Sequence, residues 1–162
     1  MTTTAPQTRT ATANVTAATT TDAKTKTRTQ LSPATGLVVS ASRVVISFLF
    51  GFHGLQGFGF FGGIDGQGGG VPFGSFPGWW GSLIELVGAI LLLIGLASRP
   101  AALLLSGTMA YAYFTVHAPE GLLPLQNMGE PAAVYSWIFL LFAVVGPGTY
   151  AVDTLIRRRR TR

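Results

Sequence analysis

The side chains most able to exchange protons lie inside apolar stretches of the sequence. Glu85 follows the start of one such stretch, Trp79, by six residues, and His53 lies about one helical turn before the end of another. A carboxylate surrounded by lipid normally turns inward, pairs or becomes protonated, and an imidazole titrates near neutral pH. The similar depth of His53 and Glu85 predicts a contact across two helices. A functional role and a purely structural pairing of Glu85 are both open at this stage.

Three more polar residues, Gln56, His117 and Asn127, fall at about the same level. Together with His53 and Glu85 they predict a polar pocket at one end of a helix bundle. Such a pocket suits a quinone, which exchanges protons with a His or a Glu beside an apolar slot. A b-type haem would need both imidazoles aimed at one iron and is not favoured. No metal site is predicted, no residue is assigned as catalytic, and the simpler interpretation of His117 is an interfacial residue.

Gly57, Gly59 and Gly62 form a GxGxxG motif, the spacing of a dinucleotide-binding turn. That turn requires a strand before it, a helix after it and an acidic residue about 20 positions later. Here an apolar helical stretch precedes the motif, more glycine follows it, and no GK[ST] sequence occurs in the chain. The motif is therefore predicted to be a flexible, close-packing loop and not a nucleotide site.

The composition indicates that these residues are surrounded by lipid. The chain is 48% hydrophobic and 10% charged, against about 25% charged in soluble domains, and its mean hydropathy is +0.45. It contains no cysteine, which excludes disulfides, thiolate metal sites and iron–sulfur clusters held by this chain. The net charge of +5 comes from basic residues near the chain ends and at one turn, so the expected partner is a membrane and not a nucleic acid.

Four apolar stretches predict membrane helices, at about residues 37–57, 79–97, 101–117 and 132–147. The first three approach the ~30 Å thickness of the hydrocarbon core, and the fourth is short and is expected to gain length from a flank. They predict an all-α membrane protein, a four-transmembrane-helix bundle within residues 36–156. Residues 1–35 are rich in threonine and predict a disordered cytoplasmic tail, with a transit peptide as the minor alternative. Residues 157–162 are a second basic tail on the cytoplasmic side.

The basic residues predict how the helices are oriented. All eleven Lys and Arg residues lie in the tails, at the entry of the first helix or in the turn after the second, and loops 58–78 and 118–131 contain none. By the positive-inside rule, both termini are expected in the cytoplasm. Arg43 is expected to extend to lipid phosphate. The arginines expected to contact lipid and set the topology are Arg43, Arg99, Arg157, Arg158, Arg159 and Arg160.

The order of several motifs resembles the DoxX family of small bacterial four-helix membrane proteins. The stretches that carry the resemblance are RVVISFLFGFHGLQGFGFFGG, GSLIELVGAILLLIGLASRPAA and VHAPEGLLPLQNMGEPAAVYSWIFLLFAVVGPGTYAVD. On this resemblance, the residues at the family's recurring polar positions are Arg43, His53, Glu85 and Asn127. Gly57 stands where family members often carry a basic residue.

The resemblance implies a supporting role in a redox complex, since the family is named after a subunit of a quinone-linked oxidase system. We therefore expect a multi-pass protein of a bacterial plasma membrane, more an accessory subunit of a quinone-linked assembly than a self-sufficient oxidoreductase. Its expected partners are the bilayer, a membrane or peripheral oxidoreductase, and further copies of itself if it oligomerises. The alternatives are a small proton-coupled transporter or lipid-binding protein centred on Glu85, and a structural scaffold.

Overall fold

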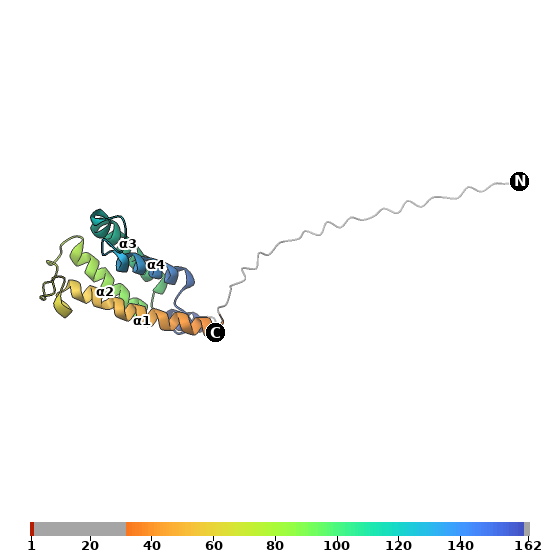
Figure 1. The fold of residues 1–162 in the computed structure, drawn as a ribbon. Coiled ribbons are helices and arrows are strands. Elements are labelled where there is room, and N and C mark those ends of the chain that lie inside the picture. The colour runs from red at the N-terminus through yellow and green to blue at the C-terminus, as the bar shows by residue number, and fades with distance from the viewer. Residues whose placement is uncertain (2–31, 161–162) are drawn as a thin grey trace. The chain divides into compact units, whose positions relative to one another are not determined.

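The computed structural model describes residue 1 and residues 32–160 (Figure 1). The α-helices of this part of the chain are α1 (Pro33–Gly57), α2 (Gly78–Ile94), α3 (Ser98–Ala112), α4 (Glu130–Val145) and α5 (Val152–Arg160). Short 3-10 or π turns follow α1 and α3, namely η1 (Phe60–Gly62), η2 (Tyr113–His117) and η3 (Ala118–Glu120). The predicted all-α class is confirmed, and these elements belong to one compact unit, Leu31–Arg162. Most of the predicted disordered tail lies outside the described residues.

Helix α1 begins earlier than the sequence predicts, because Ser32 and Pro33 start it. Ser32 Oγ accepts a hydrogen bond from Thr35 N–H at 3.1 Å, and Pro33 occupies the first turn, where a missing N–H costs nothing. Residues 33–35, predicted to belong to the tail, are thus the first turn of α1. With 25 residues, α1 is the one helix in the described ranges that is long and apolar enough to cross a membrane; α2 and α4 are apolar but have 17 and 16 residues.

Helices α1 and α2 pack side by side, and so do α3 and α4 (Figure 1). The facing pairs between α1 and α2 are Gly51 and Ala89, Gly54 and Leu86, and Gly57 and Ser82. Because the numbers rise on one helix while they fall on the other, the two helices are antiparallel. A Cβ added to Gly54 would lie 2.7 Å from the backbone nitrogen of Leu86, so the small residues let the helices touch.

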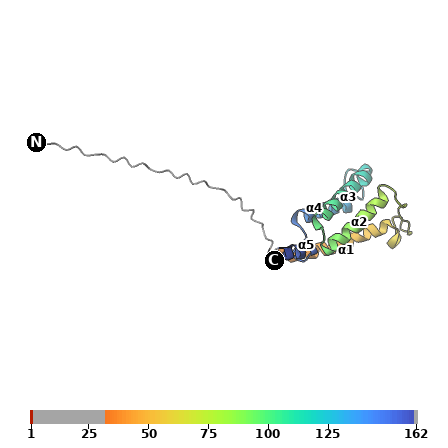
Figure 2. The same ribbon diagram turned by 180° about the vertical axis from the view of Figure 1, so that it is seen from behind.

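The loop between α4 and α5 returns to the start of α1. There Thr149 N–H donates a hydrogen bond to Gly36 O at 3.3 Å. Figure 2 shows α5 from the other side, next to the beginning of α1. The two ends of the described helical chain, residues 33–36 and 149–160, are therefore at the same end of the bundle.

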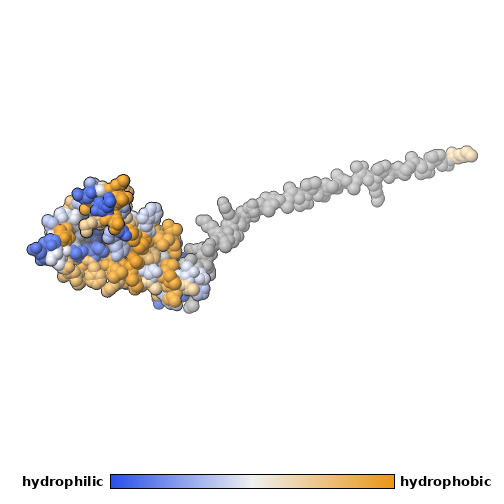
Figure 3. All heavy atoms as spheres, in the orientation of Figure 1, coloured by the Kyte–Doolittle hydropathy of each residue, from blue (hydrophilic) through white to orange (hydrophobic). Residues whose placement is uncertain are grey.

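Apolar side chains lie both inside the bundle and on its outer surface. Inside, the ring of Phe50 is fully buried and lies 4.7 Å, edge to face, from the ring of Phe139 on α4. The exposed apolar residues on the helices include Val45, Phe48, Leu49, Val87, Ile90, Leu103, Leu104, Leu141 and Val144. Figure 3 shows how far such residues cover the helical part of the molecule. Helices whose inward and outward faces are both apolar are typical of a protein surrounded by lipid.

The glycine-rich stretch after α1 folds into a closed loop. Gly59 and Gly62 have φ angles of 91° and 92°, a conformation that favours glycine. Asp65 Oδ1 accepts hydrogen bonds from Gln67 N–H and Gly69 N–H, both at 2.8 Å, and these two bonds hold the pKa of Asp65 below its ordinary value. The stretch follows a helix and not a strand, and the prediction that it forms a loop is confirmed.

Candidate functional site

The ring of His53 packs toward α4. Its neighbours are Phe50 on the same helix and Tyr135 on α4, with ring centroids 5.7 and 5.6 Å away. Both His53 and Gln56 are exposed. Within the described ranges, no hydrogen bond or ion pair joins His53 to Glu85. A joint role of His53 and Glu85 therefore stays a prediction, and no direct polar contact between the two described side chains supports it.

Glu85 lies on the side of α2 that is turned toward the bundle. Ser82 and Ala89, one turn away on either side, face α1. Gly88 faces Leu105 of α3. Because Glu85 falls on the arc between these contacts, its side chain points inward, where it is half-buried. Among the described residues, none forms a hydrogen bond or an ion pair with its carboxylate.

His117 and Asn127, two members of the predicted polar pocket, do meet. Nδ1 of His117 lies 3.1 Å from the backbone oxygen of Asn127, which can only accept, so Nδ1 carries the proton. The buried Asn127 side chain donates to Gly121 O and accepts from Gly129 N–H, both at 2.8 Å. These contacts tie the loop between α3 and α4 together. The structure thus brings together two of the five predicted pocket residues, and their hydrogen bonds fix the conformation of the loop between α3 and α4.

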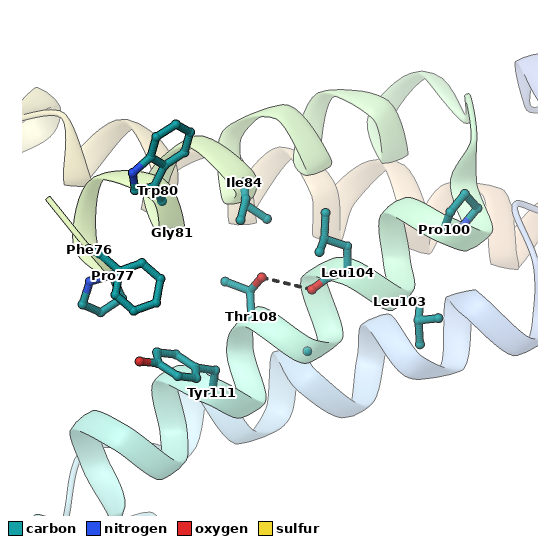
Figure 4. Close-up of a pocket in the computed structure, with 11 residues that line it drawn as sticks. Phe76, Pro77, Trp80, Gly81, Ile84, Pro100, Leu103, Leu104, Thr108 and Tyr111 are labelled. Carbon is teal, nitrogen blue, oxygen red and sulfur yellow. Dashed lines mark hydrogen bonds between the residues drawn. The ribbon is translucent and has the colours of Figure 1, made fainter. Parts of the chain in front are cut away.

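A groove of about 600 Å³ lies between α2 and α3. Figure 4 shows three aromatic residues, Phe76, Trp80 and Tyr111, toward one end of it and Pro100 at the other. The rings of Phe76 and Tyr111 are 6.4 Å apart. The walls are mostly apolar, and Thr108 contributes a hydroxyl that donates to Leu104 O at 3.0 Å.

Sequence reasoning missed this groove because its residues come from a loop and two helices. Two glycines of its lining, Gly81 on α2 and Gly107 on α3, leave the space open: a Cβ at either would meet no atom within 4 Å. The sequence carried no usable signal for the groove, because glycines also occur where helices touch closely, as Gly54 does against Leu86.

The side chain of Arg43 is completely buried, at 1% exposure. Its Nε donates to Pro147 O at 3.0 Å, and its Nη2 donates to Tyr150 O at 2.7 Å. Its Nη1 donates to the carbonyl of Leu92 and, at 2.8 Å, to that of Leu93. The prediction that Arg43 extends to lipid phosphate is therefore wrong.

The physical reason is the face of α1 on which Arg43 lies. Ser40 and Ser47, about one turn before and after it, are also buried, so this face packs against the bundle. Leu92 and Leu93 belong to the last turn of α2, where Gly95 N–H donates to Leu92 O at 3.0 Å and Arg43 adds a second donor to Leu92 O and one to Leu93 O. Arg43 connects α1, the end of α2 and the loop after α4.

Asp153, in the first turn of α5, holds the start of α3. Its two carboxylate oxygens accept from Ala97 N–H at 2.9 Å and Ser98 N–H at 2.8 Å. Burial raises its pKa, but the hydrogen bonds from Ser98 and Ala97 and the charge of Arg157 outweigh burial, so the pKa lies below its ordinary value. Asp153 is thus ionised at neutral pH, and a negative charge at a helix N-terminus is stabilising.

Comparison with known proteins shows the family. The family model described as DoxX matches residues 38–118, half of the chain. This chain belongs to the DoxX family. An uncharacterized protein of Haemophilus influenzae is 43% identical over 114 residues, which cover 68% of this chain and 84% of that relative. No solved structure matches the chain.

The DoxX match extends from the first part of α1 to Ala118, the first residue of η3. It includes Arg43, His53 and Glu85 and all walls of the groove between α2 and α3. Asn127 and Asp153 follow the matched range. The resemblance to DoxX seen in the sequence is confirmed, and the redox role that it implies stays a prediction.

Proposed function

We propose that this DoxX protein crosses a bacterial plasma membrane four times, with both termini in the cytoplasm. The apolar outer surface of α1 to α4 supports this, as do the 15 residues of α3 and the 5 of η2, which together rise about 30 Å, the thickness of the hydrocarbon core. Arg43 and Arg99 both lie against the loop after α4, so the basic residues gather at one end of the bundle.

The topology predicts where a reporter works. A reporter that is active only in the periplasm is expected to be active when inserted after Gly68, in the loop between α1 and α2, and inactive when fused to the C-terminus. The physical reason is that loop 58–78 carries no basic residue, whereas the C-terminal segment carries five arginines. An inactive reporter after Gly68, with the fusion protein present in the membrane, would contradict the four-span arrangement.

The groove between α2 and α3 is the proposed site for the ring of a quinone. Trp80, Leu103 and Tyr111 at its walls are exposed on the outer surface, so a molecule dissolved in lipid can enter from the side. Aromatic rings stack on a flat quinone ring, and the Thr108 hydroxyl, whose proton goes to Leu104 O, can accept a hydrogen bond from a hydroxyl of the reduced quinone. The volume, about 600 Å³, is that of a small-molecule site. This agreement of size, entry and lining carries the proposal.

In this function a bound quinone supplies the electron transfer, and the residues of this chain hold it, orient it and handle protons. Glu85 lies one turn after Gly81, a residue of the groove wall, and its carboxylate has no hydrogen-bond or ion-pair partner in the described ranges. It is the proposed group that takes up and releases protons beside the groove. Since the sequence contains no cysteine, electrons are exchanged through a partner oxidoreductase, and the chain acts as its accessory subunit.

Quinone content tests this function. Protein purified in mild detergent is expected to carry quinone, and Trp80→Ala is expected to reduce the quinone extracted per protein about tenfold, because a stacking ring is lost from the groove. The matched control is Trp137→Ala, which removes an exposed ring of α4 outside the groove and is expected to leave the content unchanged. Wild-type protein without quinone would contradict the assignment.

The inward, unpartnered carboxylate of Glu85 also favours a second candidate, a proton-coupled transporter. The same preparation separates the two functions. Protein that carries no quinone but conducts protons across vesicle membranes, with conduction abolished by Glu85→Gln, would support transport. Protein that does neither would favour a structural scaffold.

A further inference from the structure

A second cavity, of about 360 Å³, lies at the end of the bundle that carries the basic residues. Its charged lining is formed by Arg99 at the start of α3, Arg157 and Arg160 on α5, and Asp153. Asp153 already accepts two backbone hydrogen bonds from the start of α3 and interacts with Arg157. Three arginines and one aspartate leave the lining with two positive charges in excess, which favours an anion.

The basic cavity meets the apolar groove. Pro100 belongs to the lining of both, and Pro147 and Ile156 add apolar walls on the side of the arginines. The space on one side of Pro100 is therefore cationic, and the space on its other side is apolar and open to lipid. A molecule that fits both parts has an anionic head and a long apolar chain.

The dimensions agree with such a molecule. From Pro100 to Tyr111, the groove follows α3 for eleven residues, which rise about 16 Å, close to half of the ~30 Å hydrocarbon core. With the quinone ring of the proposed function at the aromatic end, from Thr108 to Tyr111, the acyl chain occupies the part of the groove from Pro100 to Gly107, about 10 Å along α3.

We propose that the basic cavity binds the phosphate of an anionic phospholipid of the inner leaflet, with an acyl chain along the adjoining part of α3. Arg99 and Arg160 are exposed at the cavity and supply the guanidinium groups, whose planar donors match phosphate oxygens. Arg99 is positioned by the end of α4, since a Cβ at Gly146 would lie 3.2 Å from its Nη2. The bound lipid adds a contact between α3 and α5 to the hydrogen bonds that Asp153 already makes there. The inner-leaflet position rests on the proposed topology, whereas the binding itself does not.

The experiment counts bound lipid on the full chain. The protein in mild detergent is mixed with equal amounts of phosphatidylglycerol and phosphatidylcholine that carry the same acyl chains, and the complexes are measured by native mass spectrometry. One phosphatidylglycerol is expected to be retained at least about tenfold over phosphatidylcholine. The double variant R99Q/R160Q is expected to lose this preference. The control, R158Q/R159Q, removes the same charge outside the cavity and is expected to keep it.

Two further results would overturn the proposal. Equal loss of preference in both double variants would mean that the basic segment attracts lipid only through its total charge. Displacement of phosphatidylglycerol by inorganic phosphate alone would mean that the cavity takes a free anion and the groove contributes nothing.

Leu103→Trp fills the groove next to Pro100 and leaves every arginine in place, so it is expected to reduce retention of the lipid as well. The reporter inserted after Gly68 measures topology separately, so failure of one proposal is distinguishable from failure of the other.

Discussion

Replacing Arg43 by methionine is expected to lower the free energy of unfolding by about 3–5 kcal/mol. The guanidinium donates to four backbone carbonyls, from Leu92, Leu93, Pro147 and Tyr150, and methionine fills a similar length of space without any donor. All four carbonyls lie at the junction of α2 with the loop after α4, and Leu92 O also accepts from Gly95 N–H at 3.0 Å. Denaturant unfolding in mild detergent, followed by far-ultraviolet circular dichroism, measures the loss.

Two variants give this prediction its controls. Val44→Met makes the same new side chain one residue later, on the outward face of α1, and is expected to leave stability almost unchanged because Val44 is 41% exposed. Arg43→Lys keeps the charge but presents one compact ammonium in place of a planar fork, so its stability is expected to lie between those of wild type and Arg43→Met. An Arg43→Met protein as stable as wild type would show that the buried network contributes no net stability.

The apolar stretches were sufficient to predict α1 to α4 but not their rotation, and residues 157–160, expected to be a tail, belong to α5. Apolar length predicted α1 to α4, and the Gly146 to Gly148 stop after α4 ended the last of them. Position along a helix gives depth, so His53 and Glu85 were correctly expected in apolar elements. Which way each side chain points depends on the neighbouring helices, and His53 turned to Tyr135 of α4. Depth alone therefore did not predict a contact.

The direction of the Arg43 side chain was also not predicted from its position along the helix. The positive-inside rule counts charges near helix ends and contains no information on which face of the helix a charge occupies. The neighbours Ser40 and Ser47 on the same face were the available signal, since a row of small polar residues on an apolar helix indicates packing against another helix. The groove between α2 and α3 was beyond local patterns, because its residues, from Phe76 to Tyr111, come together only in the tertiary structure.

The GPGTYAVD stretch, which carried part of the resemblance to DoxX, now has a physical explanation. Pro147 and Tyr150 present carbonyls to Arg43, and Asp153 holds the start of α3. Gly148 has a φ of 82° and lies directly against Ser40, so a side chain would be strained and would collide there. The stretch therefore joins the ends of α1, α2 and α3 at one point. The same junction forms one wall of the basic cavity, through Pro147 and Asp153.

The close contact between α1 and α2 predicts the second large effect on stability. It is tested by replacing two glycines of α1 that lie one turn apart. Gly54→Ala is expected to lower the free energy of unfolding by about 2 kcal/mol, because the new Cβ would lie 2.7 Å from the backbone nitrogen of Leu86 and 2.9 Å from its Cβ. Backbone atoms within a helix cannot move aside, so α1 and α2 must separate along their length. Gly51→Ala adds the same methyl group at 3.6 Å from Ala89 Cβ, an ordinary contact.

The two substitutions are expected to differ in sign. Alanine is a better helix former than glycine by about 1 kcal/mol, so Gly51→Ala is expected to stabilise the protein slightly, while at Gly54 the collision outweighs the same gain. Denaturant unfolding of both variants in one detergent measures the difference, and helix propensity cancels between them. Equal stability of the two variants would mean that α1 and α2 do not approach closely at Gly54. The packing that orients Arg43, Glu85 and the groove wall would then have to be different, since all three depend on how α2 lies against α1.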